Sequence, residues 1–353
     1  MKQEIRFCRS PDGVRLAYAL AGNGPPLVKA ANWLSHIEYE WNSPVWRHWY
    51  ETLADRFTLI RYDQRGCGLS DREVRNITFE TWVQDLETIV DAVGLDRFPL
   101  LGISQGGAVA AAYTARNPDK ATRLIIYGGY LRGRRLRNLT PEQEEETEML
   151  IKLIRIGWGS ENPAFRQVFT TLFLPDADLD QVKSLNRIHK YSTSAETAER
   201  IVSCFDRIDV RAMATRIDTP TLILHSRNDA RVPFEEGRMA AAMIPNARFV
   251  PLDSRNHILL KTEPAWQTFT DEVITFALTQ EAKPAGAPFV TLTFREKEVI
   301  DLVARGLSND QIADKLFISP KTVRNHITNI FGKLHIKSRP QAIVMARDAG
   351  FGR

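Results

Sequence analysis

The sequence is poor in cysteine and has no long hydrophobic run. Its 353 residues include three cysteines, Cys8, Cys67 and Cys204, which are scattered and odd in number. Because no disulfide framework or metal-ligand spacing is visible, we expect a reducing, cytoplasmic environment and no metal or other cofactor. No apolar stretch approaches the roughly 20 residues needed to span a bilayer, and residues 1–6 are too polar for a signal peptide. We therefore expect no membrane partner.

The chain also has little excess charge, and that excess is unevenly placed. Its net charge is +4 at pH 7. Residues 291–353 hold 11 Lys+Arg and 6 Asp+Glu, a net charge of +5, whereas the other 290 residues hold 36 and 37, a net charge of −1. A basic C-terminal region is the electrostatic footprint of a protein that binds an acidic partner such as DNA.

Changes of pattern along the chain predict two domains. Residues 1–278 alternate strand and helix patterns, which indicates an α/β fold with a doubly wound, mostly parallel sheet. Within them, residues 130–215 are mainly helical and polar, as in a cap over the sheet. Residues 279–288 contain two prolines and a glycine and lack apolar periodicity, so we predict a linker. Residues 289–353 are predicted to form a small all-α domain.

The larger region has clear element signals. We predict strands at residues 5–8, 14–18, 27–30, 57–62, 98–101, 123–127, 220–225 and 247–250, with helices at 78–93, 234–244 and 263–278. The first two strands are joined by a turn at residues 11–13, which is typical of a hairpin.

A Gly-x-Ser-x-Gly turn, residues 102–106, lies between a predicted strand and a predicted helix. In that context the pattern is a nucleophile elbow, in which Ser104 projects its hydroxyl above the sheet. Asp229 and His257 each follow a later strand, so both are expected at the same edge of the sheet as Ser104. Serine, acid and histidine in this order predict a catalytic triad.

At these residues the chain resembles the α/β-hydrolase superfamily, over residues 4–278. The resemblance implies that Ser104 is the nucleophile, His257 the general base and acid, and Asp229 the carboxylate that orients the histidine. It also implies that the backbone N–H groups of Gln105 and Trp33 form the oxyanion hole.

The chain departs from that family at the second oxyanion donor. The usual His-Gly pair is replaced by Ala31-Asn32. Losing one oxyanion donor typically costs ~10²–10³ in rate. Asn tolerates left-handed backbone, so a donor at Trp33 survives if Asn32 adopts it. The departure leaves two interpretations open, a slow hydrolase and a site tuned for binding.

Further residues near these motifs have structural interpretations. Residues 61–70 resemble the family's Asp-x-Arg-Gly-x-Gly-x-Ser loop, in which we expect Asp63 and Arg65 to brace a tight turn and Cys67 to be packed. For Trp33, His36, Trp41 and Trp46, pocket lining and simple core packing both remain open.

The C-terminal region predicts a helix-turn-helix. A helix at residues 308–316 is joined by Phe317-Ile318 to a second helix that begins with a Ser319 cap and Pro320. One face of the second helix is apolar, through Val323, Ile327, Ile330, Phe331 and Leu334. Its opposite face carries Lys321, Arg324, Asn325 and Thr328, which suit phosphates and base edges.

Residues 289–350 resemble the LuxR-type helix-turn-helix domain. The matching pieces run from Leu292-Thr293-x-Arg295-Glu296 through Thr322-Val323-x-x-His326 to Arg339-x-x-Ala342. The resemblance implies that Arg324, Asn325 and Thr328 enter the major groove. It further implies that Lys321, Thr322, Asn309 and Lys333 contact the DNA backbone, and that residues 340–349 form a last helix that often pairs two copies. A small helical bundle for dimerisation is the alternative.

Together the two resemblances predict a bacterial transcription regulator with an α/β-hydrolase fold as its sensor. Its expected partners are double-stranded promoter DNA, a small, partly apolar ester- or lactone-like ligand, a second copy of the chain and RNA polymerase. Three alternatives stay open: an active serine esterase or lactonase with secondary DNA binding, slow hydrolysis that terminates a signal, and a hydrolase fold that serves as a protein-interaction platform.

Overall fold

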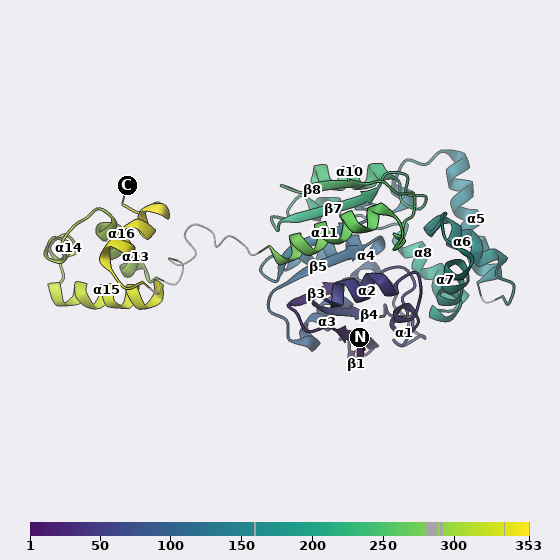
Figure 1. Ribbon diagram of the computed structural model, residues 1–353, viewed down its shortest axis with the longest axis horizontal. Coiled ribbons are helices and arrows are strands. Elements are labelled where there is room, and N and C mark those ends of the chain that lie inside the picture. Colours follow the sequence, from purple (N-terminus) through teal and green to yellow (C-terminus); the bar gives the residue numbers. More distant parts are fainter. Residues whose placement is uncertain (159, 280–288, 290–291, 335, 353) are drawn as a thin grey trace. The chain divides into compact units, whose positions relative to one another are not determined.

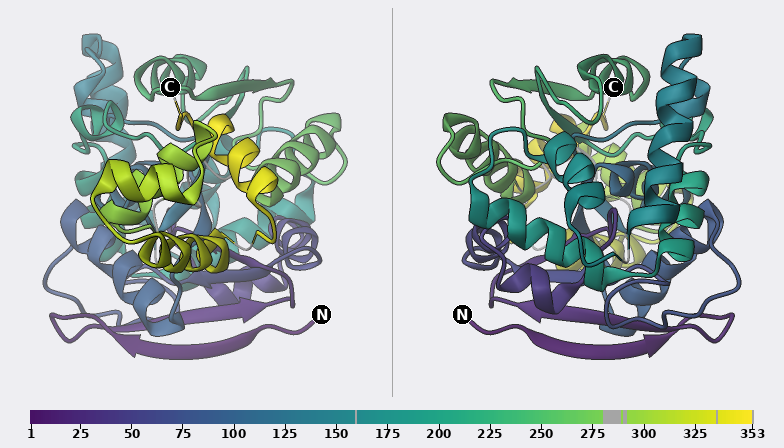
Figure 2. Two further views of the ribbon diagram at one scale, coloured as in Figure 1. Left: turned by 90° about the vertical axis from the view of Figure 1, so that its left-hand side faces the viewer. Right: turned by 90° about the vertical axis from the view of Figure 1, so that its right-hand side faces the viewer.

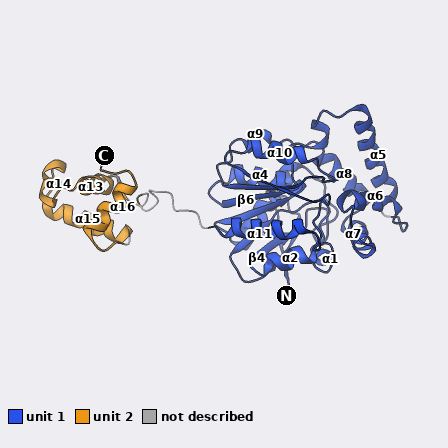
Figure 3. Cartoon of the chain, turned by 45° about the horizontal axis from the view of Figure 1, so that its top comes forward, with its two compact units in different colours: residues 1–279 blue, residues 280–353 orange. Residues whose placement is uncertain are grey.

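The computed structural model describes the chain except for residues 159, 280–288, 290–291, 335 and 353 (Figure 1). The chain divides into two compact units, Met1–Thr279 and Gln280–Arg353 (Figure 3). The predicted linker at 279–288 lies, apart from Thr279, outside the described residues. Among the described residues, no helix has the length and apolar character that a membrane crossing requires.

The larger unit is built on an eight-stranded sheet with the order β1-β2-β4-β3-β5-β6-β7-β8. The strands are β1 (Glu4–Arg9), β2 (Arg15–Ala21), β3 (Pro26–Lys29), β4 (Thr58–Tyr62), β5 (Phe98–Ile103), β6 (Ala121–Tyr127), β7 (Thr221–Ser226) and β8 (Arg248–Leu252). β2 pairs antiparallel with β1 and β4, and the pairs from β4 through β8 are parallel. The β1–β2 hairpin forms one edge of the sheet (Figure 2). The predicted fold class is confirmed.

Helices pack on both faces of this sheet. One face is covered by α3 (Phe79–Val93), α4 (Gln105–Arg116), α9 (Arg211–Ala214) and α10 (Phe234–Met243), which contact one another in turn. The other face carries α2 (Arg47–Ala54) and α11 (Pro264–Leu278), which contact each other through Trp49, Trp266 and Phe269. The ring centroids of Trp49 and Phe269 are 4.5 Å apart. Aromatic burial of this kind stabilises the core strongly.

A helical block forms the cap beyond the carboxyl ends of the strands (Figure 1). It contains α5 (Pro141–Gly157), α6 (Ala164–Phe173), α7 (Leu179–Ser192) and α8 (Ala195–Phe205), preceded by a short 3-10 helix, η1 (Arg134–Leu136). Buried apolar side chains of these helices, such as Ile154, Phe169 and Ile201, belong to the same core as the sheet.

One region of the larger unit has helices that the sequence analysis did not predict. α1 (Ile37–Trp41) and α2 follow β3. For this region the sequence analysis singled out only four residues, three tryptophans and a histidine, that could line a pocket or pack in the core. His36 accepts a hydrogen bond from the backbone of Tyr39 and so caps α1. Trp41 and Trp46 are buried and stack on Tyr50, and Trp46 also reaches the cavity described below.

The smaller unit is helical and has a separate core. Its helices are α13 (Phe294–Ala304), α14 (Asn309–Leu316), α15 (Pro320–Leu334) and α16 (Arg339–Asp348). The predicted turn between α14 and α15 is present, with Phe317 in left-handed conformation (φ +52°) and 93% exposed. Ser319 caps α15 by accepting from the Thr322 backbone N–H at 3.1 Å. The predicted apolar face of α15 packs into the core through buried Val323, Ile330 and Leu334.

Candidate active site and DNA-binding face

Ser104 occupies the sharp turn between β5 and α4. Its backbone (φ +53°, ψ −125°) is one that non-glycine residues rarely adopt. The turn leaves no room for side chains beside it, because a Cβ on Gly102 would lie 2.5 Å from the Gly106 carbonyl oxygen. A Cβ on Gly106 would lie 2.9 Å from the Ala31 carbonyl oxygen. These approaches are the physical reason for both glycines of the motif.

Asp229 and His257 are brought together behind this turn. His257 Nδ1 lies 2.7 Å from Asp229 Oδ2, and both side chains are buried. Asp229 Oδ1 accepts from the backbone N–H groups of Arg231 at 2.8 Å and Val232 at 2.9 Å. Burial opposes ionisation of Asp229, but the charge and hydrogen bond of His257 outweigh it, so its pKa falls below the ordinary value. The carboxylate can thus hold Nδ1 protonated and leave Nε2 to accept a proton.

Ser104 and His257 line the same narrow cavity. His257 Nε2 is buried there and has no hydrogen-bond partner among the described residues. The hydrogen bonds of the described residues include none between it and Ser104 Oγ. Such contacts commonly tighten only when substrate binds. The histidine can approach closely because its neighbour Gly128 (φ +55°) lacks a Cβ, which would lie 3.1 Å from His257 Cε1.

The two expected oxyanion donors come from different segments of the chain. Gln105 begins α4, and Trp33 lies in the loop after β3; both side chains line the cavity with Ser104. Within the described residues, the backbone N–H groups of Gln105 and Trp33 donate no hydrogen bond. The left-handed residue of this loop is Leu34 (φ +47°) and not Asn32, contrary to the explanation offered from the sequence.

Asn32 is held by a buried lysine instead. The Asn32 side-chain oxygen accepts a hydrogen bond from Lys29 Nζ, and both residues are buried. Burial lowers the pKa of Lys29 to about 8. The Lys29–Asn32 contact therefore braces the loop where the related family has His-Gly.

The loop after β4 is braced as expected. Asp63 accepts from the backbone N–H groups of Ile37 at 2.9 Å and Leu69 at 2.8 Å. The buried Arg65 guanidinium pairs with Asp12 and Asp85, each at 2.7 Å. Cys67 is fully buried in the same loop, and burial raises the pKa of its thiol. The structural interpretation of Asp63, Arg65 and Cys67 is confirmed.

The space above Ser104 is divided by two aromatic side chains, Trp33 and Phe173. One arm holds His257 and is otherwise mainly apolar, with Trp46, Leu185 and Ile188 in its wall. A second arm runs under the cap, between Leu150, Ile154 and Phe169, and Arg134, Asp206 and Arg231 also line it. Pocket lining by Trp33 and Trp46 is therefore observed, whereas Trp41 is core and His36 caps a helix.

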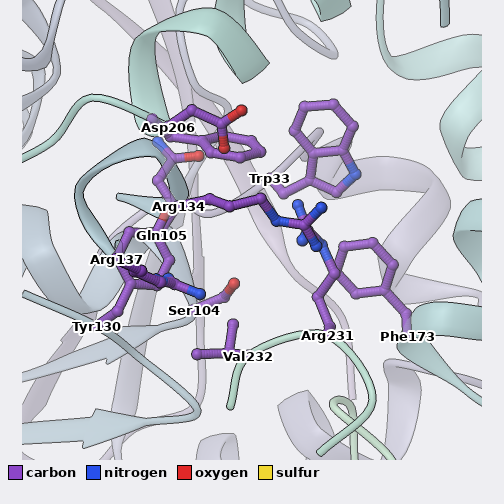
Figure 4. Close-up of a pocket in the computed structure, with 11 residues that line it drawn as sticks. Trp33, Ser104, Gln105, Tyr130, Arg134, Arg137, Phe173, Asp206, Arg231 and Val232 are labelled. Atoms are coloured by element: carbon purple, nitrogen blue, oxygen red, sulfur yellow. The ribbon is translucent and has the colours of Figure 1, made fainter. Parts of the chain in front are cut away.

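The third arm is charged, and the sequence analysis missed it. Arg134, Arg137, Arg231 and Asp206 line it together with Ser104 and Gln105 (Figure 4). Arg134 and Arg137 come from an arginine-rich run at residues 132–137, which was a signal available in the sequence. Its distance along the chain from Arg231 concealed that the tertiary fold places these cations in one cavity.

On the smaller unit, α15 presents the predicted polar face. Lys321, Arg324, Asn325 and Thr328 are exposed. Within the described part of the chain, the side chains of the first three make no hydrogen bond or ion pair, whereas the Thr328 hydroxyl donates to the Arg324 carbonyl at 3.0 Å.

The other expected DNA contacts are engaged within the unit. Lys333 Nζ pairs with Glu296 at 2.6 Å, and Asn309 Oδ1 accepts from Arg339 at 2.8 Å. The Thr322 and Ser319 hydroxyls lie 2.8 Å apart at the start of α15. These residues still border the α15 face, but their polar groups already have intramolecular partners.

Two protein families match different parts of the chain. Residues 34–208 match the family described as alpha/beta hydrolase fold, and residues 290–346 match bacterial regulatory proteins of the luxR family. Ser104 lies in the first match, whereas Asp229 and His257 lie beyond it.

Individual proteins are similar to one unit or the other. The pyrrolizixenacetamide deacetylase of Xenorhabdus hominickii is 26% identical over 242 residues, which are 67% of this chain and 86% of that protein. The oxygen regulatory protein NreC of Staphylococcus carnosus is 34% identical over 139 residues, 36% of this chain and 62% of that protein. The structure of an esterase from Exiguobacterium antarcticum superposes with a TM-score of 0.64 at 20% identity, covering 77% of this chain and 98% of that one.

The fold and the elbow define an α/β-hydrolase-fold domain, and the second unit is a LuxR-type helix-turn-helix domain. The chain is accordingly a LuxR-type DNA-binding regulator fused to an α/β-hydrolase domain.

Proposed function

We propose that the α/β-hydrolase domain is the regulator's sensor, and that it binds and slowly hydrolyses a small, partly apolar ester- or lactone-like molecule. The proposal rests on one observation: the buried His257–Asp229 pair and Ser104 face a common cavity in a chain that also presents an unengaged cationic helix face. The proposed boundaries are 1–278 for the sensor, 279–288 for the linker and 289–353 for the DNA-binding domain.

The proposed chemistry is acyl transfer to Ser104. The Oγ attacks the ligand's carbonyl carbon while His257 Nε2 takes the hydroxyl proton, and Asp229 stabilises the resulting imidazolium. The backbone N–H groups of Gln105 and Trp33 receive the oxyanion. The intermediate then collapses: the bond between the carbonyl carbon and the alcohol oxygen breaks, and His257 gives its proton to the leaving alcohol. Water next attacks the acyl-Ser104 carbonyl while His257 takes its proton, and the acid leaves as that proton returns to Ser104 Oγ. The narrow cavity under the cap favours slow exchange of ligand, which suits a sensor.

Ligand binding must be coupled to DNA binding, and the coupling is reciprocal. The DNA contacts we propose are Arg324, Asn325 and Thr328 with bases, and Lys321, Thr322, Asn309 and Lys333 with the phosphate backbone. A homodimer formed through α16, on which Val344 is 61% exposed, belongs to the same proposal, as does contact with RNA polymerase.

A fluorophosphonate probe tests the sensor directly, because it reacts covalently only with an activated serine. We expect the full-length protein to be labelled, Ser104→Ala and His257→Ala to lose labelling, and Ser203→Ala, a change outside the cavity, to keep it. DNA selected from a random pool is then titrated with labelled and unlabelled protein. We expect the two affinities to differ by about fivefold or more. Equal DNA affinities would refute the sensor, and an unlabelled wild type would refute an activated Ser104.

A working esterase with secondary DNA binding is the rival function. It is favoured by the intact His257–Asp229 hydrogen bond and by the free Nε2. Multiple rapid turnovers of 4-nitrophenyl acetate that disappear in Ser104→Ala would support it. If Ser104→Ala also leaves ligand-dependent DNA binding unchanged, hydrolysis is incidental to regulation.

A further inference from the structure

The charged side chains of the third arm have no role in the chemistry proposed above. The arm is lined by three arginines and a single carboxylate, Asp206. Cations directed into a narrow cavity beside a nucleophile need either internal partners or a ligand, because an unpaired buried charge is costly. The partners of each arginine therefore decide what this arm does.

Arg231 is the arginine without a partner. In the described part of the chain, its guanidinium makes no hydrogen bond or ion pair, and it lies over the rings of Phe173 (5.9 Å) and Phe205 (5.7 Å). Burial and the neighbouring charge of Arg134 lower the pKa of Arg231, whereas Asp206 opposes that shift. Because its backbone N–H is bonded to Asp229, the position of Arg231 is set by the same loop that orients His257.

Arg134 reinforces the positive charge at that point. Its contacts are a 3.3 Å hydrogen bond to the Thr147 hydroxyl and a loose 3.8 Å pair with the half-exposed Glu146. In Figure 4 the guanidinium groups of Arg134 and Arg231 point into the same space, between Trp33 and Phe173. Two cations that share one space attract an anion into it.

The backbone around Arg134 is built to hold this arrangement. The N–H of Gly133 donates to the Ile208 carbonyl at 2.7 Å, and that of Arg135 donates to the Asp206 carbonyl at 3.1 Å. A Cβ on Gly133 would lie 2.3 Å from the Asp206 backbone, so only glycine allows η1 to pack against the end of α8. The arginine-rich segment is therefore anchored at the cavity and is not simply a solvated surface run.

We propose that Arg134 and Arg231 form an anion-recognition subsite, and that the molecule bound above Ser104 carries a carboxylate besides the carbonyl group that the serine attacks. Arginine suits a carboxylate because its planar fork makes paired, charge-assisted hydrogen bonds. Asp206 limits the positive charge of the arm and so disfavours a doubly charged phosphate. The arm beside His257 and the apolar side of the arm under the cap then receive the rest of the ligand.

This inference rests on the proposed sensor function but is tested by a separate measurement. The probes are three anilides that the serine does not readily cleave: hexananilide, adipic acid monoanilide and 5-phosphonopentananilide. The first two have the same acyl length and differ in a terminal methyl or carboxylate, and the third ends in a phosphonate. Calorimetric titration of the full-length protein near neutral pH gives the three affinities.

We expect the carboxylate probe to bind about tenfold more tightly than hexananilide, and the phosphonate to bind less tightly than the carboxylate. Arg231→Gln is expected to remove most of that preference with little effect on hexananilide. Arg227→Gln, an exposed arginine in the same loop, is the matched control and should retain the preference. Arg134→Gln serves as a second variant if Arg231→Gln fails to fold, as judged by circular dichroism.

Equal affinities of the methyl and carboxylate probes, including no measurable binding of either at millimolar concentration, would overturn the subsite. A preference that survives in both folded arginine variants would do so too, and a stronger phosphonate would overturn the assignment to carboxylates. Ser104 labelling and ligand-dependent DNA binding are measured independently. Failure of the subsite is therefore distinguishable from failure of the sensor.

Discussion

The contact between Lys29 and Asn32 shows how a single substitution changes what holds a catalytic loop. A cation buried at 3% exposure beside the oxyanion loop is a departure from ordinary packing, because lysine is seldom buried without a carboxylate partner. Lys29 Nζ bonds the Asn32 side chain and lies 5.7 Å from the Trp46 ring centroid. The buried Lys29 that holds this loop therefore lowers the stability of the protein.

That cost gives a pH dependence with a definite sign. Burial depresses the pKa of Lys29 from 10.5 to about 8, so between these values the unfolded chain binds more protons than the folded one. The free energy of unfolding should therefore rise with pH across that window, by up to roughly 3 kcal/mol. Lys29→Met should lack this rise, and Lys261→Met, an exposed control, should keep it.

Urea unfolding at several pH values, followed by tryptophan fluorescence, measures this effect. All seven tryptophans lie in residues 1–279, so the signal reports the larger unit alone. Groups that do not interact with Lys29 titrate equally in the variants and cancel in the comparison. Parallel pH profiles for wild type and Lys29→Met would contradict the burial argument.

At the scale of single elements, α15 carries two lysines that differ in whether they have an ion-pair partner within the described residues. Lys321, at the start of the helix, is exposed and makes no ion pair within the described residues. Lys333, near its end, pairs with Glu296, whose carboxylate also accepts from the Thr293 backbone in the cap of α13. The two lysines therefore differ in the charge that they offer to a phosphate.

The salt dependence of DNA binding should reveal that difference. Lys321→Ala is expected to reduce the slope of log K against log salt by about one, since one phosphate contact is lost. Lys333→Ala should reduce it by less, because Glu296 already balances that charge. Titrations of one DNA fragment at several salt concentrations measure both slopes. Equal reductions would show that the Lys333–Glu296 pair opens on DNA.

Short helices could not be predicted from the sequence. Long helices such as α3 were predicted because apolar residues recur at helical spacing and caps mark both ends, with Thr78 at the start and left-handed Gly94 at the finish. α1 has five residues, and its first backbone N–H donates to Asp63, far away in sequence. A helix of that length is stable only through tertiary contacts, which no local pattern contains.

For the whole molecule, the main cores of the two units contain different parts of the chain. One core cluster spans the sheet and the cap, and another holds the four helices of the smaller unit. Since stability comes mainly from burial within a core, a cavity in one core should act on that unit alone.

Differential scanning calorimetry tests this independence with a reciprocal pair of substitutions. We expect two transitions in the full chain. Phe269 is 0% exposed and lies among aromatic rings. Phe269→Ala should lower the free energy of unfolding of the larger unit by about 3–5 kcal/mol, and therefore the transition temperature of that unit only. Ile330 is equally buried in the smaller unit. Ile330→Ala should lower the free energy of unfolding of the smaller unit by about 2–5 kcal/mol, and therefore the transition temperature of that unit only. A common shift of both transitions in either variant would refute independent units.

The sequence by itself determined the fold class, the elbow, the order of Ser104, Asp229 and His257, and the two faces of α15, because local spacing encodes strands, turns and amphipathic helices. Only the tertiary structure showed that Lys29 holds Asn32, that Glu296 engages Lys333, and that Arg134 and Arg231 share a cavity with Ser104. These contacts join residues through packing and electrostatics across folded elements. Periodicity along the chain identifies which face of an element is buried but not which side chain it meets.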